Sequence, residues 1–521
     1  MQPRGRRGWA PVLAGTAVTV STTAVLLGRS LGDGYLLNRD FVTVPRPVLT
    51  ARTWGFDGSA PRAVPLDAVT AVLAHAVPTG VQQQAMLVAT LLLAGVGTAA
   101  LLRRRGVVAA TVGAAVATWS PYAAERLLLG QPPTLLAWSM LPWLVLALGR
   151  ARSLRVRLLL VLVAALPAAL TPYGGVVAAA TVLGTAWLVH RAPLRELAAL
   201  ALVALGWSLP WLLPALGGRT DAGDADGASA FAAQLGGPLG VLDAFGGGGV
   251  WAQGASLESR EHWVALAATA AVLVLAAAGL SRVQGRHRTL LALLGFGTPT
   301  VVVLLATPWG RAVWGLAQSV PGMALFRDTH RVLGLAWFAI ALLAALGATR
   351  IVGAVRDVAG PVAWGSAVVA AVSLAPLSAP DAANRLDAAY APVSFPASFD
   401  RVVREATGEG VLVLPWQPLR QAAWAGSPPF LDPLPLALTG PVVSAQDLVV
   451  ERDGRLLRVG TSDPAESAAW VRGEVDAASL RQAGITRVVV WRGTPGQGLG
   501  TVAGLSLVLD TPEFQVWAVD A

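Results

Sequence analysis

The chain has 521 residues, of which 55% are hydrophobic and only 13% are charged, and its mean hydropathy is +0.59. A soluble protein of this length carries about twice that charged fraction, so a soluble globular protein is excluded. The sequence contains no cysteine, which excludes disulfides and thiolate metal sites.

The net charge of +9 is unevenly distributed along the chain. Residues 1–379 contain 28 Arg and 14 acidic residues, whereas residues 380–521 contain 11 Arg and 16 acidic residues. A basic excess confined to the apolar part is typical of arginines in the cytoplasmic loops of a membrane protein. The distribution argues against nucleic acid as a partner. It predicts a transmembrane domain over residues 1–379 and a soluble domain over residues 380–521.

Eleven apolar segments approach the roughly 20 residues that a membrane-spanning helix requires. The first follows Arg4, Arg6 and Arg7, as a cleaved signal peptide also would, but its length favours an uncleaved helix. The predicted spans are residues 9–28, 82–102, 106–121, 133–149, 157–171, 174–190, 197–216, 262–281, 289–306, 331–349 and 360–378.

The arginines predict the orientation of these helices. With the N-terminus and every second loop in the cytoplasm, the cytoplasmic segments hold 17 Arg and only the acids Glu196 and Asp357. The other loops hold 11 Arg and 12 acids. This asymmetry predicts a multi-pass protein of the bacterial plasma membrane with the C-terminal domain on the extracytoplasmic side.

The first predicted outer loop, residues 29–81, contains the first candidate for chemistry. Asp40 lies about a dozen residues beyond the first helix. An ionised carboxylate near the membrane surface has a high free energy unless it is solvated or paired, so Asp40 is a candidate for a functional residue. The alternative interpretation is a solvated loop acid that pairs with Arg39. Further along, Val64–Val77 has apolar residues at helical spacing and predicts a helix lying in the outer interface.

Two later outer segments combine acids with arginines. In Pro121–Gln131, the residues Glu125, Arg126 and Gln131 stand between two short helices, and an ion pair within the loop is the alternative. In Phe326–Arg331, Asp328 is flanked by the cationic side chains of Arg327, His330 and Arg331. Such a cluster can bind a phosphate. Asp328 alternatively caps the helix that follows.

The outer loop 217–261 is glycine-rich, with a run at Gly246–Gly249, and predicts either a flexible loop or an ordered lid over a site. Trp251 in this loop is a candidate for stacking on a sugar. Other tryptophans fall near predicted membrane edges and fit an aromatic belt, among them Trp119, Trp138, Trp207, Trp263 and Trp309.

The C-terminal 142 residues have the composition of a small soluble α/β domain. Four runs read as strands: Val411–Leu414, Arg487–Trp491, Leu505–Leu509 and Phe514–Val519. Asp476–Gly484 reads as a helix with an Asp cap and a Gly stop. No nucleophile or phosphate-loop motif is apparent, which favours a lid or a carbohydrate-binding module.

The arrangement resembles the GT-C superfamily of membrane glycosyltransferases. Three strings are similar to bacterial multi-pass proteins related to arabinofuranosyltransferases, namely Pro121–Gln131, Leu239–Gly246 and Leu325–Leu333. The resemblance implies a mainly α, polytopic membrane helix bundle with a small extracytoplasmic α/β domain. It also implies transfer of a sugar from a polyprenyl-phosphate donor to a cell-envelope glycan or lipid acceptor.

On this resemblance, Asp40 matches the first-loop acid that acts as general base, and Glu125 matches the second-loop acid that orients the acceptor or binds a metal. Arg126, Arg327, His330 and Arg331 would bind the donor phosphate, and Gln131 and Trp251 would contact sugar. Many members have paired acids in the first loop, whereas Asp40 stands between Arg39 and Phe41. Whether the protein binds a divalent cation (Mg²⁺ or Mn²⁺) therefore remains an open question.

Two other functions remain open. A transporter or flippase of lipid-linked sugars would place charged residues at the bilayer midplane, where the predicted helices carry almost none. A catalytically inactive scaffold for envelope assembly would account for the single acid of the first loop.

Overall fold

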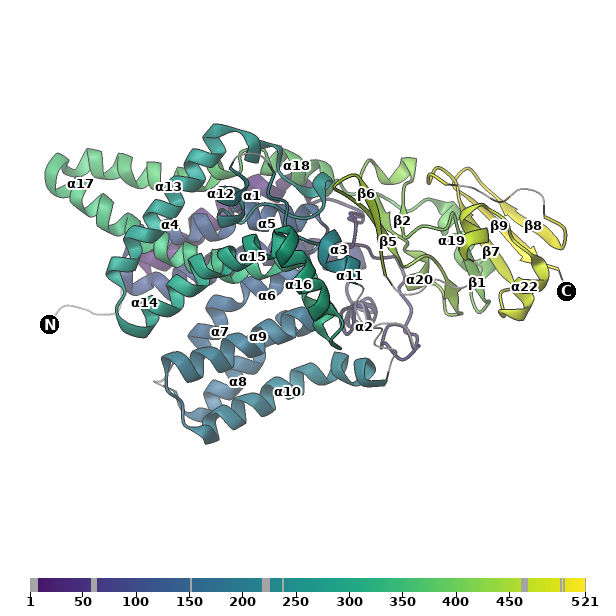
Figure 1. The fold of residues 1–521 in the computed structure, drawn as a ribbon, viewed down its shortest axis with the longest axis horizontal. Coiled ribbons are helices and arrows are strands. Elements are labelled where there is room, and N and C mark those ends of the chain that lie inside the picture. The colour runs from purple at the N-terminus through teal and green to yellow at the C-terminus, as the bar shows by residue number, and fades with distance from the viewer. Residues whose placement is uncertain are drawn as a thin grey trace.

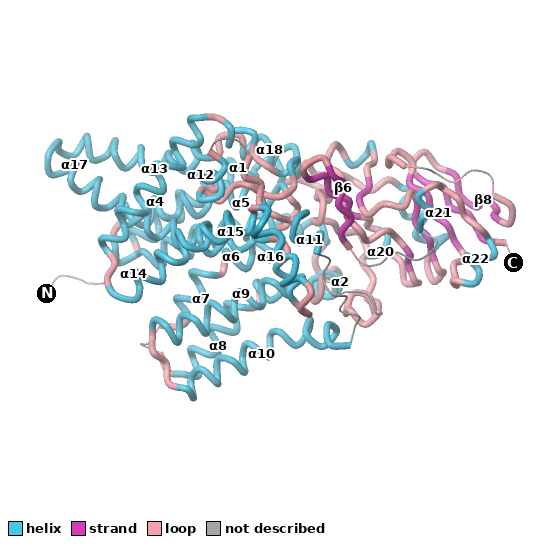
Figure 2. Tube along the Cα trace, viewed as in Figure 1, coloured by secondary structure: helices cyan, strands magenta, loops and turns pink. Residues whose placement is uncertain are grey.

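The structure is a computed structural model that describes residues 8–57, 63–149, 152–217, 225–236, 239–460, 467–496, 499 and 502–520. Helices form one end of the molecule and strands form the other, with long loops between them (Figures 1 and 2). The mainly α membrane bundle with a small C-terminal α/β part is confirmed.

Two groups of helices make up the bundle. In the central group, α1, α3 and α4 pack on one another, and α17 packs on α13 and α4. This group comprises α1 Ala10–Leu27, α3 Thr79–Leu102, α4 Val107–Thr118, α5 Pro121–Leu128, α13 Trp263–Gly279 and α17 Leu333–Ser378. The flanking group comprises α6 Pro132–Ser139, α7 Leu141–Ala147, α8 Leu154–Ala165, α9 Pro172–Gly184, α10 Leu194–Gly217, α14 Gly285–Ala292, α15 Thr298–Ala306 and α16 Pro308–Gln318.

Within the described ranges, eight helices are long and apolar enough to cross a membrane. The difference from the predicted eleven has a local cause. Pro132–Ala147 is a shorter apolar helical segment, and α8 has only 12 residues. Two predicted spans merge in α17, whose 46 residues are interrupted at Gly360, where φ is +80°. Figure 1 shows the two arms of α17 doubling back on each other. Eleven crossings therefore stay a prediction.

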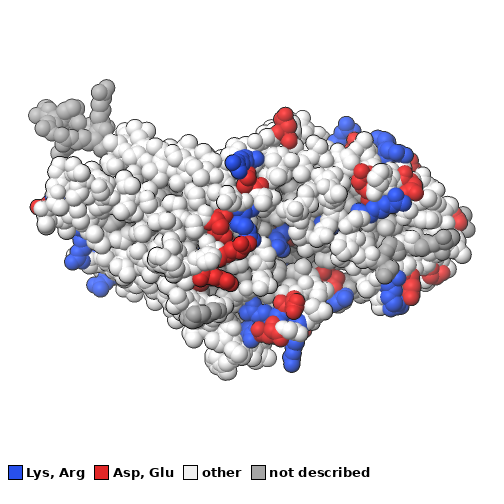
Figure 3. Space-filling view, turned by 90° about the horizontal axis from the view of Figure 1, so that it is seen from above, with Lys and Arg blue, Asp and Glu red and all other residues white. Residues whose placement is uncertain are grey.

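The surface of the helical end is nearly free of charge. Figure 3 shows charged side chains gathered over the middle and the strand-rich end, while the helical end is almost entirely uncharged in this view. Large apolar side chains are exposed there, such as Leu202 at 69% and Val274 at 63%. An uncharged apolar surface of this kind is the expected outer surface of a membrane bundle.

A close helix crossing in the bundle joins α13 and α17 at two glycines. A Cβ on Gly279 would overlap the carbonyl oxygen of Leu343, and a Cβ on Gly347 would overlap the carbonyl oxygen of Leu275. Lipid tails supply no hydrophobic driving force between helices, so close backbone contact between small residues stabilises such crossings.

Gly347→Val is therefore expected to force α13 and α17 apart and to destabilise the fold by about 1–3 kcal/mol, the usual cost of overpacking. The measurement is the melting temperature of the detergent-purified protein. Gly353→Val on the same helix is the control, because a Cβ at Gly353 would meet no atom within 4 Å. Equal melting temperatures for the two variants would contradict the argument.

The loop between α1 and α3 contacts the C-terminal part of the chain. It contains the short helix α2, Leu66–Leu73, within the segment predicted to lie in the interface. Val72 and Leu73 are about half exposed, at 48% and 47%. The loop between α10 and α13 contains α11, Ala225–Ala230, and α12, Gly240–Phe245.

The C-terminal sheet has the strand order β4-β1-β7-β9-β8, in which β1 is parallel to β4 and β7, and the other pairs are antiparallel. Its five strands include the four predicted runs, whereas β4 was not predicted. They are β1 Val411–Leu414, β4 Val442–Val443, β7 Arg487–Trp491, β8 Leu505–Asp510 and β9 Phe514–Val519. Val411 and Val413 face one hydrophobic cluster, whereas Leu412 and Leu414 face another. This is why the central strand is a continuous apolar run.

Helices and hairpins complete this part of the chain. The predicted helix is α22, Ala477–Gln482. The Asp476 carboxylate accepts hydrogen bonds from the backbone N–H groups of Ala478 and Ser479, and Gly484 follows the helix at φ +72°. The remaining elements are α18 Ala382–Ala389, α19 Ala397–Ala406, β2 Leu419–Arg420, β3 Phe430–Leu431, α20 Leu434–Ala437, β5 Leu448–Arg452, β6 Arg455–Val459 and α21 Ser467–Val471.

Candidate functional site

Helix α5 carries the centre of the site. Pro121 at the first helical position and Ser120 at the cap start this helix, and Ser120 Oγ accepts a hydrogen bond from the N–H of Ala123. Every residue of α5 is buried. Glu125 and Arg126 are neighbours on this helix and are both 0% exposed, so their charges must be satisfied inside the protein.

Arg126 is paired with Asp328, which lies 202 residues away in the sequence. Its Nη1 and Nη2 atoms lie 2.5 and 2.9 Å from the two carboxylate oxygens, a bidentate arrangement. Nη1 also donates to Gln131 Oε1 at 2.9 Å, and Nε donates to His330 Nδ1 at 3.1 Å. All three guanidinium nitrogens are thus engaged by protein atoms.

This pair corrects both alternatives raised for these residues. The Asp328 carboxylate makes no cap hydrogen bond to the helix that follows it, and Arg126 pairs with Asp328 rather than with Glu125. Burial alone would raise the pKa of Asp328, but the Arg126 guanidinium outweighs this effect and lowers the pKa to about 2. Asp328 is therefore ionised at neutral pH.

His330 is fixed by contacts on both ring nitrogens. Because Arg126 can only donate, Nδ1 must be the acceptor, and the proton resides on Nε2. Nε2 then donates to the carbonyl oxygen of Gly247 at 3.1 Å. The imidazole also stacks on Tyr122, with ring centroids 5.7 Å apart. This tautomer makes His330 a neutral link between Arg126 and the glycine-rich loop.

Glu125 holds the glycine-rich loop against α5. Its Oε2 accepts a hydrogen bond from the N–H of Val250 at 3.0 Å, and its Oε1 accepts one from the N–H of Leu257 at 3.3 Å. The loop is therefore ordered where it contacts α5, and its role as a lid stays a prediction. Glu125 lies inside the protein, under this loop.

Gln131 connects this buried network to Asp40. Its side chain is almost fully buried, and its Nε2 lies 3.5 Å from Asp40 Oδ2, while Oε1 accepts from Arg126. Asp40 itself is exposed. The structure thus places the acid of the first loop directly beside the segment that carries Glu125 and Arg126.

Asp40 stands at the tip of a tight turn between Asn38 and Phe41, whose backbone groups bond to each other at 2.8 and 3.2 Å. The Asn38 carboxamide anchors the turn by donating to the carbonyl oxygens of Leu127 and Leu128. Gly130, at φ +74°, lies directly beneath the turn, and a Cβ there would overlap the carbonyl oxygen of Asn38.

The C-terminal part of the chain holds the other side of this turn. The Arg39 N–H donates to the carbonyl oxygen of Pro429, and the Leu431 N–H donates to the carbonyl oxygen of Arg39, both at 2.8 Å. Strand β3 is braced in turn by the buried ion pair of Arg420 and Asp432, at 2.8 Å. Asp40 is therefore positioned by the bundle and the C-terminal part together.

Arg327, Arg331 and Trp251 surround the buried pair on its more exposed side. Arg327 is exposed and lies over the Phe231 ring, 4.6 Å from its centroid, and Trp251 meets the same ring edge-on. The Arg331 side chain is 23% exposed, lies over Tyr173, and its Nε is 3.4 Å from Asp328 Oδ2. These two arginines remain accessible to an anion.

A β-hairpin from the C-terminal part packs beside this group. Arg452 at the end of β5 donates to the carbonyl oxygens of Ala232 and Ala233, and Asp453 at its turn pairs with Arg311 of α16 at 2.9 Å. The hairpin thus holds the segment next to Phe231.

Sequence reasoning missed a second buried ion pair, between Asp243 of α12 and Arg260, with Nε and Oδ1 2.5 Å apart. Arg260 Nη1 also donates to Thr269 Oγ1 and to the carbonyl oxygen of Ser378. Burial raises the pKa of Asp243 and the Arg260 charge opposes this. The string Leu239–Gly246 gave a signal for Asp243, but its partner stands 17 residues further on.

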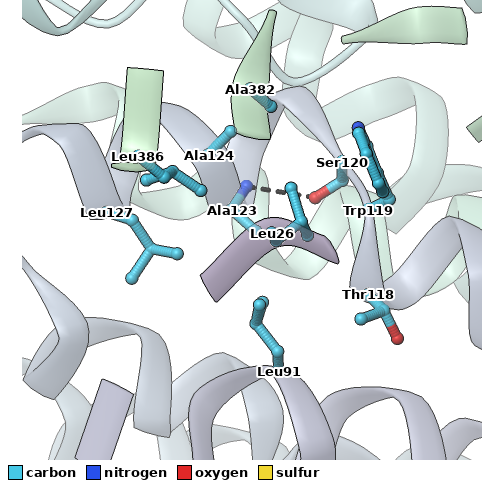
Figure 4. Close-up of a pocket in the computed structure, with 10 residues that line it drawn as sticks. All are labelled: Leu26, Leu91, Thr118, Trp119, Ser120, Ala123, Ala124, Leu127, Ala382 and Leu386. Carbon is cyan, nitrogen blue, oxygen red and sulfur yellow. Dashed lines mark hydrogen bonds between the residues drawn. The ribbon is translucent and has the colours of Figure 1, made fainter. Parts of the chain in front are cut away.

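Behind α5 lies a small apolar pocket. Figure 4 shows side chains from α1, α3 and α18 meeting those of α5, including Leu26, Leu91 and Leu386. Its lining is apolar apart from Thr118 and Ser120. Packing of this kind fixes α5 but offers no groups for chemistry. Among the described residues, no three His, Asp or Glu side chains gather closely enough to hold a metal ion.

The apolar helices and the small α/β part define a class, the polytopic membrane proteins built on a helix bundle. The sequence itself matches no protein-family model and no curated protein.

Two solved structures are similar to this chain. One is the arabinofuranosyltransferase AftD from Mycobacteria, with a TM-score of 0.56 and 18% identity, over 97% of this chain and 41% of that chain. This chain thus spans about two fifths of the length of that structure. The other is ArnT from Cupriavidus metallidurans in the apo state, with a TM-score of 0.44, 14% identity and 97% coverage of both chains.

Proposed function

We propose that the chain is a membrane glycosyltransferase that transfers a sugar from a polyprenyl-phosphate donor to a cell-envelope glycan or lipid acceptor. The reaction takes place at the extracytoplasmic end of the bundle, the orientation that the arginine distribution favours. The similarity in fold to an arabinofuranosyltransferase supports this class of reaction.

A continuous set of contacts carries the proposal. Gln131 contacts both Asp40 and Arg126 through its side-chain amide. Asp328 in turn forms ion pairs with Arg126 and Arg331. An exposed carboxylate and a partly exposed guanidinium are thereby held at fixed positions by a rigid, buried network. Transfer of a sugar from a phosphate donor requires a general base and a cation at fixed positions relative to each other.

In the proposed reaction, the acceptor hydroxyl oxygen bonds to the anomeric carbon of the donor sugar while its proton passes to the Asp40 carboxylate. The bond between the anomeric carbon and the phosphate oxygen breaks, and the electron pair leaves with polyprenyl phosphate. Arg327 and Arg331 stabilise the negative charge of this leaving group. Trp251 offers an apolar face to a sugar.

The buried residues have a different role in this proposal. The polar side-chain atoms of Arg126, His330 and Glu125 are already engaged by protein atoms. We therefore assign them to positioning rather than to contact with the donor. Gln131 orients the Asp40 carboxylate through its amide.

The test is a transfer assay with the purified full chain, a radiolabelled polyprenyl-phosphate sugar and an envelope glycan extract. Wild-type protein is expected to release polyprenyl phosphate. Arg327→Gln and Arg331→Gln are each expected to lower kcat/KM for the donor roughly tenfold to hundredfold, the value of a hydrogen bond to a charged group.

Arg29→Gln is the control, because Arg29 is an exposed outer arginine whose ion pair with Asp387 lies on the surface. It is expected to keep wild-type kinetics. A donor kcat/KM that is the same for all three arginine variants would remove Arg327 and Arg331 from the donor site. Transport of the labelled lipid across a vesicle without its turnover would favour a flippase.

A further inference from the structure

A second site candidate lies where the π-helical turn that follows α9 contacts α14. The last turn of α9 is a π-helix, Thr185–Val189, and it faces the start of α14. A cavity of about 380 Å³ opens between them. Trp187, Leu188, Arg191, Ala192 and Arg286 line it.

The two arginines of this cavity have guanidinium nitrogens that can donate hydrogen bonds to a ligand. Arg286 Nη1 donates to the carbonyl oxygen of Leu188 at 3.0 Å, which fixes the side chain across the cavity and leaves its other nitrogens for a ligand. The Arg191 side chain makes no hydrogen bond or ion pair with any residue that the structure describes. Both side chains are exposed.

The backbone at Arg191 is strained. Its φ is +49°, the left-handed conformation that normally follows the end of a helix and is normally occupied by glycine. A long cationic residue in this position points to a function, because such strain persists where a site requires it. The π-helical turn beside it is a second feature that occurs often at functional sites.

The charge around the cavity is almost entirely positive. Residues 185–196 and 280–297 contain five Arg and two His, and Glu196 is their only acid. Glu196 is already paired with Arg157, at 2.6 Å. Trp187 is 65% exposed at the rim, as is typical of a tryptophan at the interface of a membrane.

We propose that this cavity binds the phosphate headgroup of an anionic phospholipid from the leaflet that the arginines mark as cytoplasmic. Arg191 and Arg286 bind the phosphate, and Trp187 and Leu188 lie against the glycerol and the first acyl carbons. The site is separate from the proposed reaction, because Asp40, Arg327 and Arg331 belong to the outer end of the bundle.

The test is native mass spectrometry of the delipidated, detergent-purified full chain, titrated with phosphatidylglycerol and, in parallel, with phosphatidylcholine. Wild-type protein is expected to bind one phosphatidylglycerol in preference to phosphatidylcholine. Each arginine removed is expected to weaken this binding roughly fivefold, so Arg191→Gln/Arg286→Gln approaches the level of phosphatidylcholine. Competition by inorganic phosphate alone, at the same concentrations, would assign the site to a free anion and overturn the proposal.

Two further variants separate a built site from diffuse charge and from misfolding. Arg288→Gln removes the same charge from α14 outside the cavity and is expected to leave binding unchanged. Arg191→Gly relaxes the strained backbone, so it is expected to weaken lipid binding while the melting temperature stays equal or rises. Equal loss in Arg288→Gln, or unchanged binding in the double variant, would overturn the proposal.

Discussion

Asp40→Asn is expected to lower kcat for sugar transfer by about 10²–10⁴-fold, the usual contribution of a general base. The amide keeps the shape of the carboxylate but cannot accept the proton of the acceptor hydroxyl. Because Asp40 is exposed and its turn is held by Asn38, Gly130 and the backbone of β3, the variant is expected to fold normally. The KM for the polyprenyl-phosphate donor is expected to change little, since the donor meets the arginines.

The measurement is the rate of radiolabelled transfer at saturating donor, with the melting temperature recorded for each variant. Asp33→Asn is the matched control, because Asp33 is another exposed acid of the same loop. Asp40→Glu is expected to retain part of the activity, since it keeps a carboxylate but moves it. Wild-type rates for Asp40→Asn would remove this residue from the mechanism and leave the inactive scaffold as the better account.

The parts of the fold that sequence predicted well are those set by local chemistry. The strands β1 and β7 are short, valine-rich apolar runs buried on both faces, and α22 begins at an Asp whose carboxylate caps it. These features depend on residues within a few positions of one another. The hydropathy pattern likewise identified the bundle, although Gly360 turns one long helix into two antiparallel arms.

The parts that sequence could not predict depend on tertiary contacts. Asp328 directly precedes a helix, so a cap was the natural local interpretation, but Arg126 competes for the same carboxylate from 202 residues away. A bidentate, charged partner in a dry environment is stronger than a cap, and only the fold brings the two together. The position of Asp40 beside Gln131 depends in the same way on Gly130.

The aromatic belt illustrates the same limit. Trp263 and Trp309 are 78% and 76% exposed, as a belt requires, but Trp119, Trp138 and Trp207 are buried inside the protein. The indole N–H of Trp119 donates to the carbonyl oxygen of Ala379. A tryptophan that is buried and whose N–H group is hydrogen-bonded inside the protein, such as Trp119, is explained by tertiary packing rather than by an aromatic belt.

The largest effect on stability is expected when the Arg126–Asp328 pair is broken from one side. Arg126→Met or Asp328→Asn is expected to destabilise the protein by about 3–5 kcal/mol, because each removes the bidentate partner of a buried charge and Arg331, 3.4 Å from Asp328, replaces it only in part. The melting temperature in detergent and the yield of folded protein measure this. Arg385→Met is the control, since its partner Glu258 is 84% exposed and solvated, so this ion pair contributes about 0–1 kcal/mol.

The double variant Arg126→Met/Asp328→Leu distinguishes two contributions to the free energy of unfolding. One is the stabilisation that the ion pair provides, and the other is the destabilisation caused by a buried charge without its partner. It removes both charges and is expected to be more stable than either single variant, although His330 and Gln131 lose a donor. Transfer is expected to remain low in it, because Gln131 no longer has Arg126 to orient it toward Asp40. A double variant as unstable as the sum of the singles would show that the two side chains do not act as a pair.

Acid titration gives an independent test of the same pair. The pKa of Asp328 is about 2 in the fold and near 3.9 in an unfolded chain, so the pair's stabilisation is fully present above about pH 5. It is lost as the pH falls through 4 toward 2, where the carboxyl group takes up a proton and the buried guanidinium loses its counter-charge. Asp328→Asn is therefore expected to flatten this acid limb of the stability curve, because its side chain has no proton to gain in that range.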